Sequence, residues 1–355
     1  MAHARWDVGV LGATGTVGQQ LVRRLAAHPW FRLTWLGASE RSTGRRYADL
    51  PWRLPGDVPA PARDLVVDDA VPGRPPRLVF SAIDAEAAAR LEPDFAAHGH
   101  IVVSNTRTHR LDPDVPLVVP EINPEHLALI RTQQRTRGWT GAIVTNPNCS
   151  TVFLALVLSA VRRFEPARVL VTTLQALSGA GHPGVPSWDL LGNVIPFIEG
   201  EERKIETETA RILGTFTGTH VAEYPIAISA QATRVHVLDG HTEAISIGFE
   251  RPPAIGDLIE SLRTFAGRPQ RAGLPSAPVS PIAVLDDESR PQPRLDAERG
   301  DGMTVSVGRI RRCPVLHYKL VALGHNTIRG AAGAAILNAE LLDADGWLDG
   351  QVTSC

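Results

Sequence analysis

In the first half of the chain, short apolar runs alternate with segments of helical periodicity, and this alternation limits the possible folds more than any other feature. Five apolar runs are predicted to be strands: Asp7–Leu11, Leu33–Gly37, Leu78–Ile83, Ile101–Ser104 and Ala142–Thr145. Strands that are apolar throughout and separated by helices are typical of a parallel sheet with both faces covered. We therefore predict an α/β fold built on a Rossmann-type, doubly wound parallel sheet.

The second half of the chain has a different pattern. The segments Ala244–Phe249 and Met303–Ile310 alternate apolar and polar residues, which is typical of a sheet with one covered face. This pattern predicts a second domain of the α+β class. The predicted boundaries assign residues 1–148 together with 326–355 to the first domain and residues 149–325 to the second.

The remaining segments are assigned from composition. A long apolar helix is expected after Cys149, as far as about Arg163, and a helix of small residues from about Asn326 to Leu342 is expected to pack against the first domain. Two proline-rich stretches, Pro51–Pro76 and Pro269–Pro293, are predicted to be surface loops.

Charge and cysteine content limit the partners and the compartment. The formal net charge is −2, so no overall field attracts nucleic acid or an anionic membrane. No run reaches the roughly 18 apolar residues that a membrane-spanning helix needs. The three cysteines, an odd and sparse number, argue against a disulfide framework. We expect a cytoplasmic protein with small-molecule ligands, no nucleic-acid or membrane partner and no metal site.

A glycine-rich loop lies between the first predicted strand and the first helix. The loop has the sequence GATGTVG, with glycines at residues 12, 15 and 18. Such a turn lets backbone N–H groups approach a pyrophosphate, whose negative charge is favoured at the N-terminus of a helix. The residues predicted to bind a dinucleotide here are Gly12, Thr14, Gly15, Thr16, Val17 and Gly18.

The residues after the second predicted strand indicate which dinucleotide is bound. An acidic residue at this position hydrogen-bonds the ribose of NAD, whereas an arginine accommodates the 2′-phosphate of NADP. The segment contains Ser39, Glu40, Arg41 and Ser42. A guanidinium with neighbouring hydroxyls suits a phosphate. We therefore predict NADP(H), bound by Ser39, Arg41 and Ser42, although Glu40 argues for NAD.

Cys149 is the candidate nucleophile. It lies in the sequence TNPNCST, where a predicted strand ends and an apolar helix begins. A cysteine at a helix N-terminus lies at the positive end of the helix dipole, so its pKa is expected to fall and its thiolate to form. Among twelve histidines, His241 follows Gly240, which implies a turn that presents the imidazole for acid–base chemistry. Spacing alone does not establish that Cys149 and His241 meet.

Several segments together resemble the aspartate-semialdehyde dehydrogenase family. They are GATGTVG, TNPNCST, LQALSGAG, IPFIEGEERKIETE, RVHVLDGH and HNTIRGAAG, and the resemblance extends from about Asp7 to Leu342. The forms VPEIN at Val119–Asn123 and HNT at His325–Thr327 resemble the branch typified by archaeal and fungal enzymes. The resemblance implies an enzyme of amino-acid biosynthesis that converts L-aspartyl-4-phosphate and NADPH to L-aspartate 4-semialdehyde, phosphate and NADP⁺.

The resemblance also implies roles for the catalytic residues. Cys149 would form a thioester with the acyl group, His241 would be the general acid/base, and Gln175 would orient the acyl group. The second domain would be both the catalytic and the dimerisation domain. The family forms dimers or tetramers through it, so a homodimer or homotetramer is expected.

Further roles concern the charged groups of the substrate. By resemblance, Arg234 would bind the α-carboxylate and Glu201 the α-amino group, while Lys204, Arg110 and Asn148 would form the phosphate site. A planar guanidinium matches a carboxylate in two hydrogen bonds, and a lysine acts as a point charge on phosphate. Four further residues are expected near the cofactor: Ser178, Gly179, Asn326 and Thr327.

Two positions depart from the family pattern. His236 stands where proline is usual and adds a second imidazole near the active segment, and Gly192 precedes Asn193 where aspartate is usual. The exact acyl substrate is therefore left open. A malonyl-CoA reductase would use the same cysteine and NADPH, but malonyl has no α-amino group for Glu201. N-acetyl-γ-glutamyl-phosphate reductase is related in mechanism, but the GEERK and RVHVLDGH segments fit it less well.

An alternative of another class is a non-catalytic, NADP-binding sensor on the same fold. The joint presence of Cys149, Gln175, Arg234 and His241 argues against it, since a sensor would have little need for all four.

Overall fold

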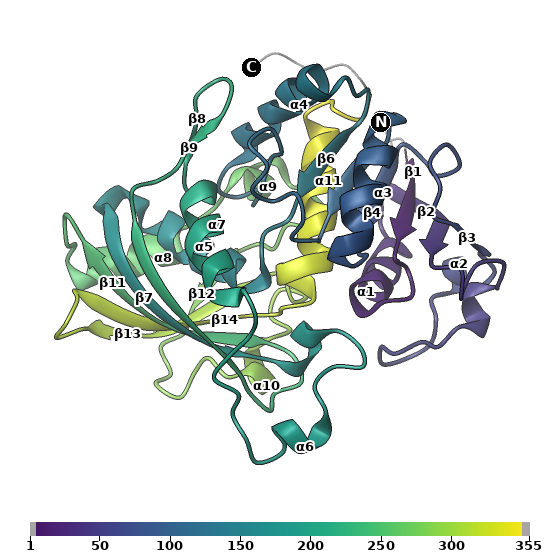
Figure 1. Ribbon diagram of the computed structural model, residues 1–355. Coiled ribbons are helices and arrows are strands. Elements are labelled where there is room, and N and C mark those ends of the chain that lie inside the picture. Colours follow the sequence, from purple (N-terminus) through teal and green to yellow (C-terminus); the bar gives the residue numbers. More distant parts are fainter. Residues whose placement is uncertain (1–4, 350–355) are drawn as a thin grey trace.

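The computed structural model describes residues 5–349 and contains two large sheets (Figure 1). The first has the order β3-β2-β1-β4-β5-β6, and all its neighbouring strands are parallel. Its strands are β1 (Trp6–Leu11), β2 (Phe31–Ala38), β3 (Val67–Asp69), β4 (Leu78–Ser81), β5 (Ile101–Ser104) and β6 (Ala142–Thr145). The strand order reverses beside β1, where a dinucleotide is commonly bound.

Helices cover both faces of this parallel sheet. On one face, apolar residues of α1 (Thr16–Leu25), α4 (Leu129–Arg137) and α11 (Gly333–Ala344) form a buried cluster with the strands. On the other face, Phe95 and Ala96 of α3 (Ala85–Ala97) pack against the sheet. The predicted doubly wound fold is therefore confirmed. The expected return of the C-terminal helix to this sheet is also seen, although residues 350–355, including Cys355, lie outside the described part.

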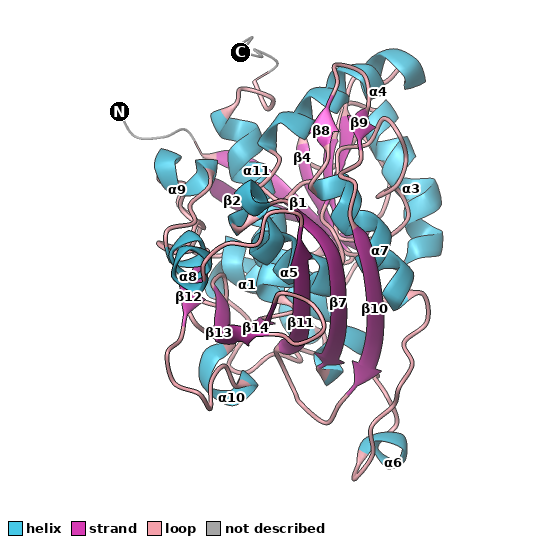
Figure 2. Ribbon diagram, turned by 90° about the vertical axis from the view of Figure 1, so that its left-hand side faces the viewer, coloured by secondary structure: helices cyan, strands magenta, loops and turns pink. Residues whose placement is uncertain are grey.

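The second sheet is mixed, with the order β10-β7-β11-β14-β13-β12 (Figure 2). Its strands are β7 (Pro166–Gln175), β10 (Ala227–Arg234), β11 (His241–Phe249), β12 (Ile282–Val284), β13 (Val305–Arg312) and β14 (Tyr318–Gly324). The pairs that β11 forms with β7 and β14 are antiparallel, whereas β7 and β10 are parallel. This mixed sheet confirms the predicted α+β class of the second half.

One face of the second sheet is covered and the other is open. Apolar residues of α5 (Cys149–Ala160), α7 (Glu201–Ile212) and α8 (Ile255–Arg263) pack on the covered face. Along β7 the side chains alternate between buried and accessible, and Leu170 and Leu174 are exposed on the open face. An open apolar sheet face of this kind is a candidate interaction surface.

Shorter elements occupy the connections. Those with helical geometry are α2 (Ala60–Arg63), α6 (Ser187–Leu190), α9 (Arg268–Ala272) and α10 (Pro293–Asp296), with short turns at Tyr47–Asp49, Pro124–Ala128, Arg162–Phe164 and Leu177–Ala180. Strands β8 (Thr215–Phe216) and β9 (Val221–Ala222) form a small hairpin. No helix among residues 5–349 is long and apolar enough to cross a bilayer.

The prediction that both proline-rich stretches are loops is wrong in part. The first stretch contains α2 and β3, and the second contains β12 and parts of α9 and α10. Both β3 and β12 are three-residue strands at sheet edges. A strand of three residues is defined by its pairing with a neighbour that is distant in the sequence. Local composition therefore does not reveal it.

A π-helical turn joins the two domains beside Cys149. This turn, η5 (Ile328–Ala332), leads directly into α11. Its Arg329 is fully buried and donates two hydrogen bonds to the Glu121 carboxylate, at 2.8 and 2.7 Å. Such π turns recur at functional sites because they displace backbone from the regular helical path. Here the turn brings the backbone of Gly330 against Cys149, where an added Cβ would lie 2.5 Å from the cysteine Cβ.

Candidate active site

Cys149 is the first residue of α5, and the preceding Asn148 caps that helix. The Asn148 Oδ1 accepts hydrogen bonds from the backbone N–H groups of Ser150 at 3.0 Å and Thr151 at 3.2 Å. An asparagine cap satisfies N–H groups that the helix leaves unpaired. The predicted strand–turn–helix setting of the cysteine is confirmed, and its side chain is half-buried where the two domains meet.

The predicted fall in the pKa of Cys149 is wrong for the unliganded protein. Burial and the negative charge of Glu201 raise the pKa of the thiol to about 12, and the opposing effects of Lys204, Arg110 and the Ser150 N–H group are smaller. The dipole of one helix therefore does not offset the removal of water together with a nearby carboxylate. The resting thiol is therefore protonated at neutral pH, mainly because it is buried.

Glu201 lies at the centre of the polar groups around the cysteine. Its Oε1 accepts hydrogen bonds from Asn148 Nδ2 at 2.6 Å and from Gln175 Nε2 at 3.1 Å, and its Oε2 accepts one from Lys204 Nζ. Burial disfavours the charge, but the Lys204 ammonium and these hydrogen bonds outweigh it and lower the pKa of Glu201. Glu201 is thus an ionised, buried carboxylate.

His241 lies on the covered face at the start of β11. Its Nδ1 accepts a hydrogen bond from the Ala176 backbone N–H at 3.0 Å, while its Nε2 is buried without a partner. Burial, aided by the charge of Arg234, lowers the pKa of His241 to about 3, so the ring is neutral. Because a backbone N–H only donates, the ring proton lies on Nε2, and His241 offers an N–H donor to the site.

Gly179 lies close to the side chains of both Arg234 and His241. The Arg234 Nη1 donates to the Ala176 carbonyl at 2.6 Å. A Cβ added at Gly179 would lie 3.0 Å from this nitrogen and 3.1 Å from the His241 Nε2. A side chain at Gly179 would therefore crowd both polar groups.

Glu208 connects the first domain to the start of α5. Its Oε1 accepts a hydrogen bond from Arg110 Nη1 at 3.0 Å, and its Oε2 accepts one from the Asn148 backbone N–H at 2.6 Å. Arg110 is nearly fully buried and also donates to the Asn105 carbonyl at 2.9 Å. This bridge sets the position of Arg110 relative to the nucleophile.

The structure thus brings the candidate catalytic and substrate-binding residues together. Cys149 interacts electrostatically with Glu201, Lys204 and Arg110, and with Arg234. The charges of Glu201 and Arg234 also act on the His241 ring. The additional imidazole of His236, in contrast, is exposed and lines a cavity of about 540 Å³ that none of these residues lines.

A cavity of about 780 Å³ lies over the carboxyl end of β1. Predicted cofactor residues that line it are Gly12, Thr14, Gly15, Ser39 and Arg41. Gly12 has φ = +83°, and a Cβ there would approach the Ala82 carbonyl oxygen to 2.6 Å, so this turn requires glycine. No side chain caps the N-terminus of α1, and its first N–H groups remain available to a phosphate.

A second cavity, of about 790 Å³, lies between the two domains and is lined in part by Thr16, Ser178 and Thr327. Asn326, between the lining residues His325 and Thr327, donates to Ser178 Oγ at 2.7 Å and accepts from the Gly240 N–H at 2.9 Å. The two cavities share the glycine-rich loop as a border, which suits a ligand with two nucleotide halves.

Five predicted cofactor residues line neither cavity: Gly179 and Asn326, whose contacts are given above, and three residues of the first domain. Gly18 packs against the turn, since an added Cβ would lie 2.1 Å from the Gly12 carbonyl oxygen. Val17 packs against the core of the first domain, and the Ser42 N–H donates to the Ser39 carbonyl at 2.8 Å. These three residues shape the binding loops.

Sequence reasoning missed two residues of the site. Glu208 lies seven residues after Glu201 and so on the same face of α7, a spacing that was readable from the sequence. Gly330 gave no local signal, because its approach to Cys149 depends on the π-helical turn. The departure at Gly192 has a local reason, since its φ of +67° favours glycine. Among residues 5–349, no group of three or more His, Cys, Asp or Glu side chains is arranged to hold a metal.

Comparisons with known proteins cover almost the whole chain. A family model described as "Semialdehyde dehydrogenase, NAD binding domain" matches residues 7–130, and one described as "Semialdehyde dehydrogenase, dimerisation domain" matches residues 158–329. A protein of Archaeoglobus fulgidus named aspartate-semialdehyde dehydrogenase is 47% identical over 346 residues, covering 95% of this chain and 98% of the relative. One of the same name from Methanothermobacter thermautotrophicus is 49% identical over 343 residues, covering 95% and 99%.

Solved structures of aspartate semialdehyde dehydrogenases also resemble this chain. The crystal structure of aspartate semialdehyde dehydrogenase with NADP from Candida albicans has a TM-score of 0.88 at 43% identity, covering 96% of this chain and 99% of that one. The Vibrio cholerae enzyme II complexed with ASA has a TM-score of 0.76 at 26% identity, with the same coverage.

The bridge made by Glu208 predicts a large effect on stability. Glu208→Ala leaves the buried Arg110 without its counter-charge and the Asn148 N–H without an acceptor, so we expect the free energy of unfolding to fall by about 3–5 kcal/mol. Glu208→Gln keeps an acceptor and should cost less. Urea unfolding measures both, with Arg203→Ala on the exposed face of α7 as a control expected within about 0.5 kcal/mol of the wild type. Equal stabilities of Glu208→Ala and this control would contradict the role of the bridge.

Proposed function

The chain belongs to the aspartate-semialdehyde dehydrogenase family, and we propose that it catalyses the reversible, NADPH-dependent reduction of L-aspartyl-4-phosphate to L-aspartate 4-semialdehyde and phosphate. The archaeal and fungal relatives agree with the branch expected from the motifs. The observation that carries the proposal is a helix-terminal thiol, Cys149, surrounded by one ionised carboxylate and three cationic side chains.

These charges suit the proposed substrate. Glu201 is buried and ionised, so it fits an α-ammonium group, and the fork of Arg234 fits an α-carboxylate. Lys204, Arg110 and Asn148 are proposed to form the phosphate site. A dianionic phosphate would have to attract the Lys204 ammonium away from Glu201. The substrate ammonium would then take the place of Lys204 at the carboxylate.

Thiolate formation has to overcome the effects of burial and of Glu201, which raise the pKa of Cys149 in the unliganded site. A substrate ammonium bound at Glu201 would place a positive charge beside the thiol, as Lys204 and Arg110 already do, and so favour the thiolate. The thiolate then attacks the acyl carbon, the C–S bond forms, and phosphate leaves with the electron pair of the broken C–O bond.

His241 and Gln175 are proposed to act on the acyl group and its surroundings. The Nε2–H of His241 is positioned to donate to the acyl oxygen and so to stabilise negative charge there. Gln175 donates to Ser150 and to Glu201 and so fixes the first turn of α5. Collapse of the thiohemiacetal breaks the C–S bond, releases the aldehyde and restores the thiolate.

The chain's own residues fit NADP(H). Backbone N–H groups of the Gly12–Gly18 loop would hold the pyrophosphate, and Ser39 and Arg41 line the part of the cavity suited to a 2′-phosphate. Ser178, Asn326 and Thr327 would border the nicotinamide half. When bound, the nicotinamide supplies the hydride that reduces the thioester.

The alternatives are not favoured. A malonyl-CoA reductase would leave the ionised Glu201 without an ammonium partner, at a cost in binding. A sensor would not need a nucleophile that Gly330 and the cap of Asn148 hold so closely.

We further propose that the first domain consists of residues 1–148 and 326–355, because the cavity over β1 belongs to it. The second domain would consist of residues 149–325, which contain most of the charged groups of the site. The free thiols of Cys149 and Cys313 support a reducing, cytoplasmic location.

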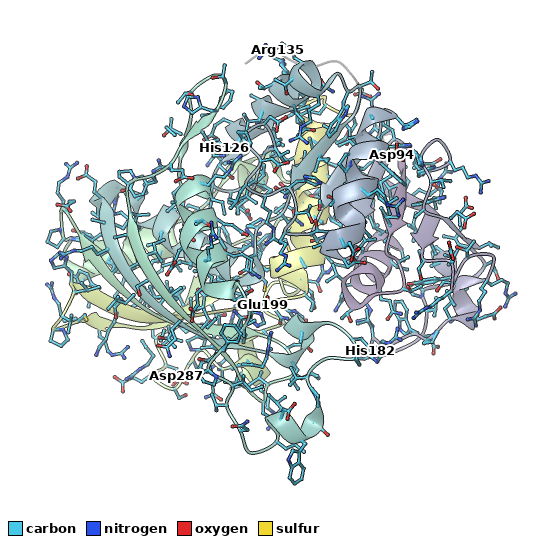
Figure 3. All side chains as sticks on the ribbon, viewed as in Figure 1. Asp94, His126, Arg135, His182, Glu199 and Asp287 are labelled. Carbon is cyan, nitrogen blue, oxygen red and sulfur yellow. The ribbon has the colours of Figure 1, made fainter. Side chains whose placement is uncertain are left out.

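A homodimer or homotetramer is proposed to form through the second domain. The arm made by residues 182–199, whose ends are near the labelled His182 and Glu199 in Figure 3, carries exposed apolar side chains. They are Trp188 (91% exposed), Leu191 (60%), Val194 (56%) and Phe197 (66%). Together with Leu170 and Leu174 of the open sheet face, they form an apolar surface that a second copy would cover.

Replacing the nucleophile tests the activity. Phosphate-dependent reduction of NADP⁺ with aspartate semialdehyde is expected for the wild type. Cys149→Ser should lower kcat at least about 1,000-fold, because a hydroxyl is a far weaker nucleophile here. Cys313→Ser is the matched control and should be fully active. Turnover by Cys149→Ser within tenfold of the wild type would exclude the thioester mechanism.

Arg41→Ala tests the cofactor assignment. Loss of a charge-assisted contact of about 1.5–3 kcal/mol should raise KM for NADP⁺ roughly 10- to 100-fold while KM for NAD⁺ changes little. Arg45→Ala removes a nearby exposed guanidinium that bonds the Asp49 carbonyl and should leave both values unchanged. Equal effects of Arg41→Ala on both cofactors would refute the assignment.

Trp188→Asp tests the oligomer. A charge in an apolar interface is strongly unfavourable, so sedimentation velocity at micromolar concentration should show a shift toward monomer. Val279→Asp, at a residue 98% exposed outside the arm, should leave the oligomer intact. An unchanged sedimentation coefficient for Trp188→Asp would place the interface elsewhere.

A further inference from the structure

A buried carboxyl group that none of these roles uses lies beside the first turn of α5. Glu243 is on β11, two residues after His241, so both side chains point to the covered side of the sheet. The Glu243 side chain has 0% exposure. In the ladder it lies opposite Thr173 of β7 and Ala322 of β14.

The surroundings of Glu243 do not suit a negative charge. Neither carboxyl oxygen has a hydrogen-bond partner of good geometry among the described residues, and the one donor that acts on the group is the Ser150 hydroxyl. The charged side chain that acts on it is Glu201, of the same sign. Burial, with a smaller contribution from Glu201, raises the pKa of Glu243 well above its usual value.

Ser150 links Glu243 to the catalytic groups. It follows Cys149 in α5, and its Oγ accepts a hydrogen bond from Gln175 Nε2 at 3.1 Å. The same nitrogen lies 3.1 Å from Glu201 Oε1. Hydrogen bonds of Gln175 therefore connect Ser150 to Glu201 behind the nucleophile, and the buried, unpartnered carboxyl group of Glu243 lies at the Ser150 end. In a low-dielectric interior, the donors and acceptors of connected hydrogen bonds polarise one another.

We propose that Glu243 is a positioning residue whose uncharged carboxyl group holds Ser150, and through it the Gln175 amide, in the orientation that the Cys149 site needs. The proposal rests on the proposed function. The two buried carboxyl groups have opposite states, because Glu201 must be charged to receive an ammonium group. A second negative charge at Glu243 would repel Glu201 and oppose formation of the thiolate.

Two substitutions distinguish a neutral positioning group from a charged one. Glu243→Gln keeps the size and the neutrality, so we expect kcat within about threefold of the wild type. Glu243→Ala removes the support of Ser150, so kcat should fall about 10- to 100-fold while KM for NADP⁺ changes little. Ile247→Ala, which removes a fully buried side chain further along the same face of β11, is the control for lost packing and should change kcat little. Full activity of Glu243→Ala, or equal losses in Glu243→Gln and Glu243→Ala, would overturn the proposal.

Infrared spectroscopy tests the protonation state of Glu243 without an activity measurement. At neutral pH, the difference spectrum between wild type and Glu243→Gln should contain a carboxylic-acid C=O band that the variant lacks. A carboxylate band in its place would overturn the proposal. Because this measurement uses the unliganded protein, it stands even if the proposed reaction fails, and it needs only Glu243→Gln if Glu243→Ala does not fold.

Discussion

One buried carboxylate, Glu201, determines the electrostatics of the whole site. Its two oxygens connect α7 to the cap of α5, to the end of β7 and to Lys204. Its charge is also a reason why the resting Cys149 thiol stays protonated. Among the charges around the thiol, Glu201 thus opposes thiolate formation, whereas Lys204 and Arg110 favour it. In the proposed mechanism, the same carboxylate also binds the substrate ammonium.

The fold places this charge where two domains meet. The parallel sheet presents its glycine-rich loop and two flanking cavities, whereas the mixed sheet and α7 supply Gln175, Glu201, Lys204, Arg234 and His241. Cys149 begins the helix that leads from one sheet to the other. The fully buried ion pair of Arg329 and Glu121 fixes the π-helical turn that places Gly330 against Cys149. Burying such an ion pair costs desolvation free energy, so its contribution here is to fix the geometry of the turn.

Local sequence patterns predicted much of this arrangement. Apolar runs placed β1, β4, β5 and β6 closely, and the strand–turn–helix setting of Cys149 followed from the residues around it. The three-residue strands β3 and β12 were missed because pairing, and not propensity, defines them. The pKa of Cys149 was predicted in the wrong direction, because a helix dipole is visible in the sequence, whereas the burial of the thiol and the carboxylate beside it are not. The contacts of Glu208 and Gly330 join segments far apart in the chain, beyond the range of local patterns.

The central claim is that the thiol of Cys149 carries the acyl group. Mass spectrometry of the intact protein tests it directly, after incubation with aspartate semialdehyde and NADP⁺ in the absence of phosphate. The account predicts one aspartyl group per chain, located by peptide mapping at Cys149 and removed when phosphate is added. An unmodified Cys149 after this phosphate-free incubation, or an adduct at another residue, would contradict it.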